Sequence, residues 1–146
     1  ATACKIKAAL KLGERIQEPT KLGPKINKPE DVHNLLKIAL GRKKKEYFYL
    51  ICLDSRNRII VTETISIGTL DASLAHPREI FLSAIKNSAS SVILIHNHPS
   101  GDTQPSSKDK ELTQRLREAG KIIGIPIADH IIITQDAYFS FTENSL

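Results

Sequence analysis

The chain has 146 residues, of which 40% are hydrophobic and 25% charged, and its formal net charge is +5. These values are typical of soluble globular proteins and exclude a disordered or collagen-like chain. The sequence contains no apolar run of the roughly 18–20 residues that a membrane span requires. It also does not open with a secretory signal pattern. The length suits one domain of ordinary size.

The chain has two cysteines and no methionine. Neither Cys4 nor Cys52 belongs to a C-x-x-C pair, so we expect neither a disulfide framework nor a thiolate zinc site. This cysteine usage favours a reducing compartment, and we expect a cytoplasmic protein. The missing initiator methionine predicts that the sequence is a fragment of a longer chain.

Charge is distributed unevenly along the sequence. Residues 1–45 carry 12 basic and 4 acidic side chains, a net charge of +8, whereas residues 46–146 carry a net charge of −3. Such a basic segment can contact DNA or another polyanion, although a solvated surface beside an ordinary domain has the same composition. The sequence does not indicate an oligomeric state.

The first 28 residues are predicted to form a helix and a linker. Apolar residues recur at helical spacing over 3–16, whereas 18–29 contains three prolines, which disfavour a helix or a central strand. A lone helix before a linker cannot bury its own apolar stripe. We therefore predict that 1–28 is the remnant of a preceding segment and that 29–146 is the domain.

Helical and strand patterns alternate from residue 29 onwards. A helix is predicted to begin after Pro29 and to end at Gly41, with acidic residues in its first turn. We expect the buried side of this helix to comprise Val32, Leu35, Leu36, Ile38, Ala39 and Leu40. A strand over 46–54, a turn and a second strand over 58–67 have the pattern of a β-hairpin.

The second half of the chain continues this alternation. A helix is predicted to begin at Pro77, and the apolar run over 91–96 is typical of a strand covered on both faces. A further helix over 106–122 is followed by two closing strands over 126–134 and 137–141. The predicted fold class is α/β, with a mixed β-sheet flanked by helices.

Two of the five histidines have an unusual arrangement. His96 and His98 lie two residues apart at the end of the buried strand, and side chains at that spacing share one face of a strand. Two protonated imidazoles side by side would repel each other, but neutral imidazoles can share a metal ion. The pair is therefore a candidate metal site.

A carboxylate further along the chain can complete this site. The loop over 99–105 contains prolines and a glycine that turn the chain, so the helix that begins at Ser106 can bring Asp109 back to the strand end. Two histidines, one carboxylate and an open position are typical of catalytic zinc. As an alternative, Ser106 and Asp109 form only a helix capping box. Asp102 is a rival ligand, although its loop position favours a turn.

The full pattern resembles a known family. The spacing His96-x-His98-x₇-Ser106-x₂-Asp109 resembles the signature of the JAMM, or MPN+, metalloprotease domains. The flanking residues resemble the bacterial RadC-like branch in the stretches 68–70, 76–81, 96–101 and 129–132, and the likeness covers residues 29–143. Residues 6–15 resemble the end of the helix-hairpin-helix segment that precedes this domain. The resemblance implies a JAB/MPN-like, cytidine-deaminase-like fold.

The resemblance also implies an activity, the zinc-dependent hydrolysis of peptide or isopeptide bonds in a peptide or protein substrate. The implied zinc ligands are His96, His98 and Asp109. Ser106 would stabilise the oxyanion, and Glu46, at the start of an early strand, would act as general base. Glu79 is the competing candidate for the general base.

Several alternatives remain open. His130 is either in contact with the metal ligands or a half-buried structural histidine, and Arg78 either receives a substrate anion or pairs with a nearby acid. The association of the RadC family with DNA repair suggests a DNA-associated module with a structural or nucleolytic metal. A metal-free scaffold is a third interpretation, which the intact motif disfavours.

Overall fold

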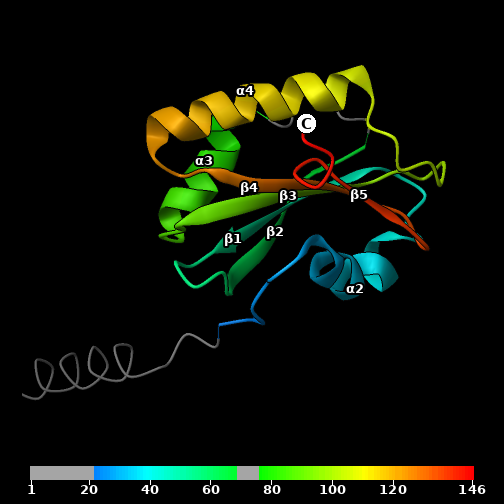
Figure 1. Ribbon diagram of the computed structural model, residues 1–146, viewed down its shortest axis with the longest axis horizontal. Coiled ribbons are helices and arrows are strands. Elements are labelled where there is room, and N and C mark those ends of the chain that lie inside the picture. The colour runs from blue at the N-terminus through cyan, green and yellow to red at the C-terminus, as the bar shows by residue number, and fades with distance from the viewer. Residues whose placement is uncertain (1–21, 69–75) are drawn as a thin grey trace, which may run out of the picture.

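The computed structural model describes residues 22–68 and 76–146, so the predicted helix over 3–16 lies outside the described residues. One β-sheet lies between helices that cover both of its faces (Figure 1). This arrangement confirms the predicted α/β class with a mixed sheet flanked by helices. Among the described residues, no helix is long and apolar enough to cross a lipid bilayer.

The sheet has five strands in the order β2-β1-β3-β4-β5. Their bounds are Tyr47–Leu53 for β1, Ile59–Ile67 for β2, Ser91–Asn97 for β3, Ile127–Ile133 for β4 and Tyr138–Ser140 for β5. Strands β3 and β4 are parallel, and the other neighbours are antiparallel. Parallel neighbours need a long crossover, which helix α4 (Ser107–Ile123) provides.

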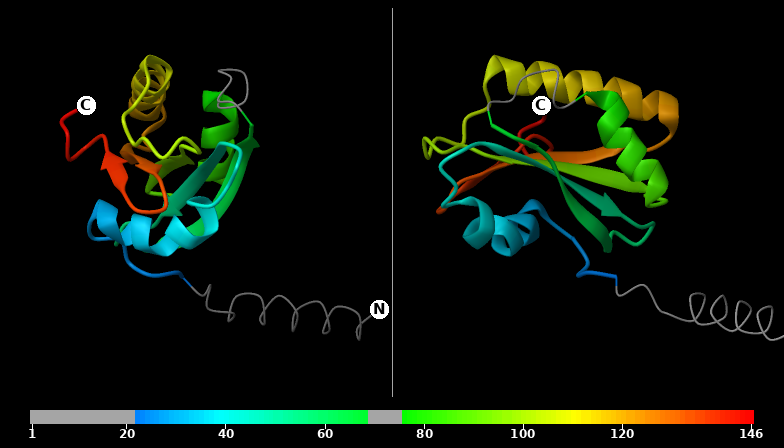
Figure 2. Two further views of the ribbon diagram at one scale, coloured as in Figure 1. Left: turned by 90° about the vertical axis from the view of Figure 1, so that its right-hand side faces the viewer. Right: turned by 180° about the vertical axis from the view of Figure 1, so that it is seen from behind.

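The helices form two layers. Helices α3 (Pro77–Lys86) and α4 cover one face of the sheet, and helix α2 (Pro29–Leu40) covers the other (Figure 2). Side chains alternate along β3, so Val92 and Leu94 pack on the α3/α4 side, while Ile93 and Ile95 pack on the α2 side. The same alternation places His96 on the α3/α4 side, next to the start of α4.

Helix α2 buries only part of the predicted side, since Val32 and Leu40 are buried as predicted but Ala39 is exposed. Leu35 is 45% exposed and Ile38 is 79% exposed, whereas Val32, His33 and Leu40 are buried. At 100° per residue, positions 32, 33, 36 and 40 lie on one side of a helix, and 35 and 38 lie on the other. The sequence is apolar on more of this helix than the sheet covers.

The described part of the predicted linker contacts the β1–β2 hairpin. The amide of Gly23 donates to the carbonyl of Ile59 at 2.7 Å, and the amide of Ile26 donates to that of Asn57 at 2.8 Å. The side chain of Ile26 belongs to the core beneath α2. Residues 23–26 therefore pack onto the domain, and the division of the chain at residue 28 stays a prediction.

Candidate metal centre

The structure brings His96, His98 and Asp109 together. His96 is in β3, His98 follows that strand, and Asp109 is in the first turn of α4. The Nε2 atoms of the two histidines are 2.9 Å apart. Oδ1 of Asp109 lies 3.3 Å from Nε2 of His96, and Oδ2 lies 3.6 Å from Nε2 of His98. The three side chains could hold a metal ion.

These separations fit a tetrahedral cation. Ligand atoms at about 2.0–2.1 Å from a tetrahedral zinc ion are roughly 3.3 Å from one another. The two Nε2 atoms are 2.9 Å apart, and each lies 3.3 or 3.6 Å from a different oxygen of Asp109, so these distances lie on both sides of that value. One ligand atom from each residue lies within 4.8 Å of the others. His96 and Asp109 are buried, and the side chain of His98 is 13% exposed. The site therefore opens to solvent at His98.

The hydrogen bonds behind His96 fix its tautomer. The Thr113 hydroxyl donates to the carbonyl of Asp109 at 2.6 Å, because a carbonyl only accepts. Its oxygen, 2.6 Å from Nδ1 of His130, must then accept a proton from that nitrogen. Nε2 of neutral His130 consequently accepts from Nδ1 of His96 at 2.8 Å. This chain leaves the Nε2 lone pair of His96 directed at His98.

His98 is oriented in the same manner. Its Nδ1 donates to the backbone carbonyl of Asp102 at 2.7 Å, so its neutral form also has a lone pair on Nε2. Two lone pairs 2.9 Å apart repel each other unless a proton or a metal cation lies between them. Both tautomers are the ones that a metal ligand needs.

Burial and charge act together in this centre. Burial lowers the pKa of His96 and, to a greater extent, that of His130, so both rings are neutral. The adjacent Asp109 carboxylate favours the protonated form of His98 and raises its pKa despite partial burial, with smaller contributions from the Asp102 carbonyl and the charge of Glu46. Although burial raises the pKa of the Asp109 carboxyl, the adjacent His96 and His98 rings and the Ser106 hydroxyl hold it well below its usual range. Asp109 is therefore an anion, as a metal ligand must be.

The predicted helix cap formed by Ser106 and Asp109 is present in the structure. The Ser106 amide and hydroxyl both donate to Oδ2 of Asp109 at 2.7 Å, and the Asp109 amide donates back to the hydroxyl. Asp109 thus caps α4 and faces the histidines with the same carboxylate. The rival ligand Asp102 closes a turn instead, since its Oδ1 accepts from the amide of Gln104.

Glu46 lies immediately before β1, and its backbone is attached to the strand that carries the histidines. The Asn97 side chain accepts from the amide of Tyr47 at 2.8 Å and donates to the carbonyl of Lys45 at 3.0 Å. The Glu46 carbonyl accepts from the amide of Gly68 at 2.8 Å. Glu46 lines a cavity that also includes Pro99, the residue after His98.

Glu79, the competing candidate for the general base, forms an ion pair with its neighbour Arg78. Nε of Arg78 lies 2.9 Å from Oε1 of Glu79 in the first turn of α3. The structure therefore shows Arg78 in a local ion pair, and a contact of Arg78 with a substrate anion stays a prediction. The partner of Glu79 thus lies on the same helix.

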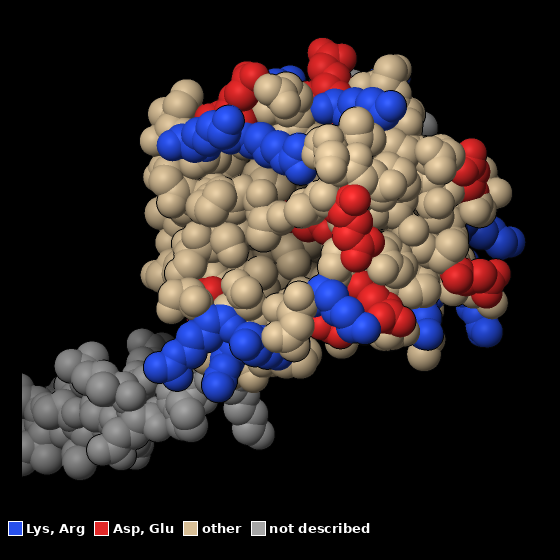
Figure 3. Space-filling model, viewed as in Figure 1, with Lys and Arg blue, Asp and Glu red and all other residues tan. Residues whose placement is uncertain are grey.

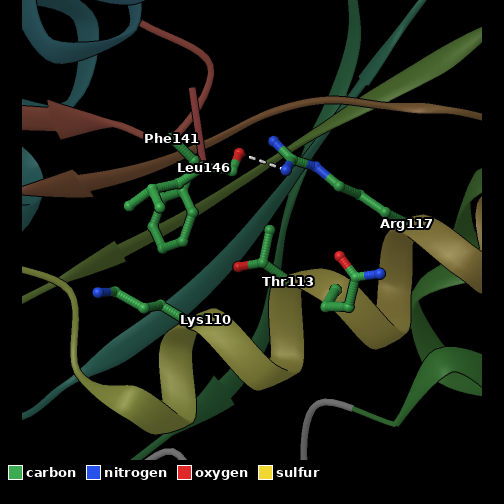
Figure 4. A pocket seen from close by; sticks show the side chains of 6 residues that line it. Lys110, Thr113, Arg117, Phe141 and Leu146 are labelled. Atoms are coloured by element: carbon green, nitrogen blue, oxygen red, sulfur yellow. Dashed lines mark hydrogen bonds between the residues drawn. The ribbon is translucent and has the colours of Figure 1, made fainter. Parts of the chain in front are cut away.

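A second hollow is lined by residues of α4 and of the C-terminal segment (Figure 4). It has a volume of about 260 Å³, and Thr113 and Phe141 are among its lining residues. The Phe141 ring stacks on His130 with centroids 4.7 Å apart. The figure also shows Arg117, which donates to the carbonyl of Leu146. His130 is fully buried and contacts Thr113, Phe141 and His96. It therefore touches a candidate ligand and is not half-buried.

Sequence reasoning missed Thr113 and Asn97 and left His130 open. Thr113 lies four residues after Asp109 on the predicted helix. This spacing places both residues on one helix face and could have identified Thr113. Asn97 lies between the two histidines, so its side chain leaves the strand on the opposite face. Its attachment to residues 45–47 depends on the pairing of β1 with β3.

Comparison with known proteins identifies the family. A family model described as the RadC-like JAB domain matches residues 26–146. The chain belongs to the RadC-like JAB domain family. It is 48% identical over its whole length to a UPF0758 protein of Alkaliphilus metalliredigens and 50% identical to one of Alkaliphilus oremlandii. A third, from Caldanaerobacter subterraneus subsp. tengcongensis, is 49% identical over 98% of this chain.

This RadC-like JAB domain chain is shorter than its curated relatives. It spans 63% of the two Alkaliphilus proteins and 62% of the Caldanaerobacter protein. The predicted DNA contact through the basic N-terminal segment stays a prediction, because residues 1–21 lie outside the described ones. On the face in Figure 3, the described basic side chains lie in separate groups, with uncharged and acidic residues between them.

Proposed function

We propose that this RadC-like JAB domain is a zinc-dependent hydrolase of peptide or isopeptide bonds. The observation that carries the proposal is the convergence of the two Nε2 atoms, 2.9 Å apart, beside the Asp109 carboxylate. A set of two imidazoles and one carboxylate suits zinc with one position left open. The partial exposure of His98 supports access of a substrate to that position.

A zinc ion bound there supplies a nucleophile at neutral pH by lowering the pKa of a water molecule to about 7, and it polarises the scissile carbonyl. Glu46 takes the proton of the attacking water and passes it to the departing amine. The support for Glu46 is its place in the cavity next to His98 and the attachment of its two neighbours, Lys45 and Tyr47, to Asn97.

Ser106 stabilises the negative charge that develops on the scissile carbonyl oxygen. Its hydroxyl has one proton, which in the structure is donated to Oδ2 of Asp109. A cation held by His96, His98 and Asp109 would draw charge from Oδ2 and so would leave the hydroxyl proton available to a substrate. Ser106 is exposed at the start of α4, so a substrate can contact it.

The test is a cleavage screen with the zinc-loaded chain on peptide, isopeptide and DNA substrates. Glu46→Gln is expected to keep its zinc and to lose hydrolysis by at least about 100-fold, the usual contribution of a general base. Cleavage of peptide or isopeptide bonds that is lost in this variant supports the proposal. Unchanged cleavage by Glu46→Gln would assign the base to another residue. Cleavage of DNA alone would favour the nucleolytic alternative.

A further inference from the structure

A cavity lies beside the metal centre and is not explained by metal binding. Its volume is about 430 Å³, and its lining residues are Lys44, Lys45, Glu46, Gly68 and Pro99. This volume is within the range of ligand-binding pockets, about 300–1,000 Å³. Pro99 directly follows His98, so a chain bound across the open side of the centre also passes along this cavity.

The backbone of the lysine segment is held in place. The Lys45 carbonyl accepts from the Asn97 amide group, which lies between the two candidate ligands in sequence. The neighbouring Glu46 carbonyl accepts from Gly68. Because Asn97 is only 1% exposed, the main chain under the two lysines is anchored to the strand of the metal centre. The side chains of Lys44 and Lys45 therefore extend from a fixed segment of main chain beside the metal centre, where the scissile bond of a substrate would lie.

The charge of the cavity lining is positive. Lys44 and Lys45 are both exposed, and no salt bridge within the described ranges joins either of them to a carboxylate. Glu46 is the acidic residue of the lining, and the proposed function assigns it to proton transfer. Two flexible ammonium groups at the edge of a cavity attract anionic groups of a ligand.

We propose that Lys44 and Lys45 bind acidic side chains of the substrate next to the scissile bond, so that the enzyme prefers acidic peptides. This proposal rests on the proposed hydrolase function. Binding of single-stranded nucleic acid uses exposed aromatic faces for stacking. None of the described residues that line the cavity is aromatic, so a peptide is favoured over a nucleic acid. The nearby Tyr47 ring is covered by the Lys43 ammonium group, 5.0 Å from its centroid.

The experiment compares short fluorescein-labelled peptides of equal length that alternate alanine with Glu, Gln or Lys. A single-stranded DNA oligonucleotide with the same label is the fourth probe. Binding to the zinc-loaded chain is measured by anisotropy at low salt, and cleavage is measured by mass spectrometry. The test variant is Lys44→Glu/Lys45→Glu. The control is Lys86→Glu/Lys121→Glu, which changes the net charge equally at exposed positions away from the cavity.

The Glu peptide is expected to bind about tenfold more tightly than the Gln peptide, as two partly exposed ion pairs allow. The test variant should lose this preference, and the control variant should keep it. Equal binding of the three peptides, an equal loss in the control variant, or tighter binding of DNA would overturn the inference. Cleavage of all peptides without a preference would overturn the inference alone, whereas binding without cleavage of any peptide would contradict the hydrolase function.

Discussion

At the scale of single residues, the centre depends on side chains that do not face the open site. His96 owes its free Nε2 lone pair to His130, and His130 owes its tautomer to Thr113. The sequence pattern predicted the three ligands because His96 and His98 share a strand face and Asp109 begins a helix. It did not predict this second set, because the contact of His96 with His130 depends on how β3 pairs with β4.

Thr113→Val tests the importance of this second set. Valine has nearly the shape of threonine but no hydroxyl, so Nδ1 of His130 loses its partner and the tautomer of His96 is no longer fixed. Loss of a group that orients a metal ligand typically lowers metal affinity by about 10–100-fold, and we expect a loss of this size for zinc. Thr113→Ser keeps the hydroxyl and is the control. The same dissociation constant for Thr113→Val and the wild-type chain would show that the tautomer is fixed by other contacts.

At the scale of secondary-structure elements, local signals predicted bounds better than buried faces. The cap at Ser106 and the proline at residue 77 placed the starts of α4 and α3 within one residue. The buried side of α2 was predicted too wide, because its sequence is also apolar at Leu35 and Ile38, which the sheet does not cover. Spacing alone does not show which part of a wide apolar stripe meets a neighbour.

Gly120 marks a close contact of α4 that the sequence pattern does not reveal. A Cβ atom at this position would lie 2.6 Å from the carbonyl oxygen of Ile125 and 3.3 Å from the Phe81 ring. In an exposed helix, replacing glycine by alanine stabilises by about 1 kcal/mol. Here we expect Gly120→Ala to lower the free energy of unfolding by about 1–3 kcal/mol, since the backbone must shift.

Urea denaturation measures this effect. Lys121→Ala, at an exposed position of the same helix, is the control and should change the free energy of unfolding by less than about 0.5 kcal/mol. An increase in stability for Gly120→Ala would show that α4 can move away from Ile125 without cost.

At the scale of the whole molecule, the class of the fold was predictable and its strand order was not. Alternating helices and strands indicated a mixed sheet, and the apolar run at 91–96 indicated a buried strand. The β-hairpin is a local feature, whereas the placement of β3 between β1 and β4 joins segments far apart in the sequence. This order brings residue 46, the histidines and the start of α4 to one end of the sheet. That Glu46 lies near the metal was predicted only from the family resemblance, not from its position in the sequence.

Zinc content per folded chain tests the central claim most directly, because the whole account depends on three side chains that hold one ion. Equilibrium dialysis followed by elemental analysis should give about one zinc per wild-type chain. His96→Ala and Asp109→Ala should lose the zinc, with circular dichroism to confirm their fold. Ser106→Ala removes the helix cap without removing a ligand, so it should keep the zinc. Equal zinc in the wild-type chain and the Asp109→Ala variant, or no zinc in either, would contradict the assignment of the metal centre.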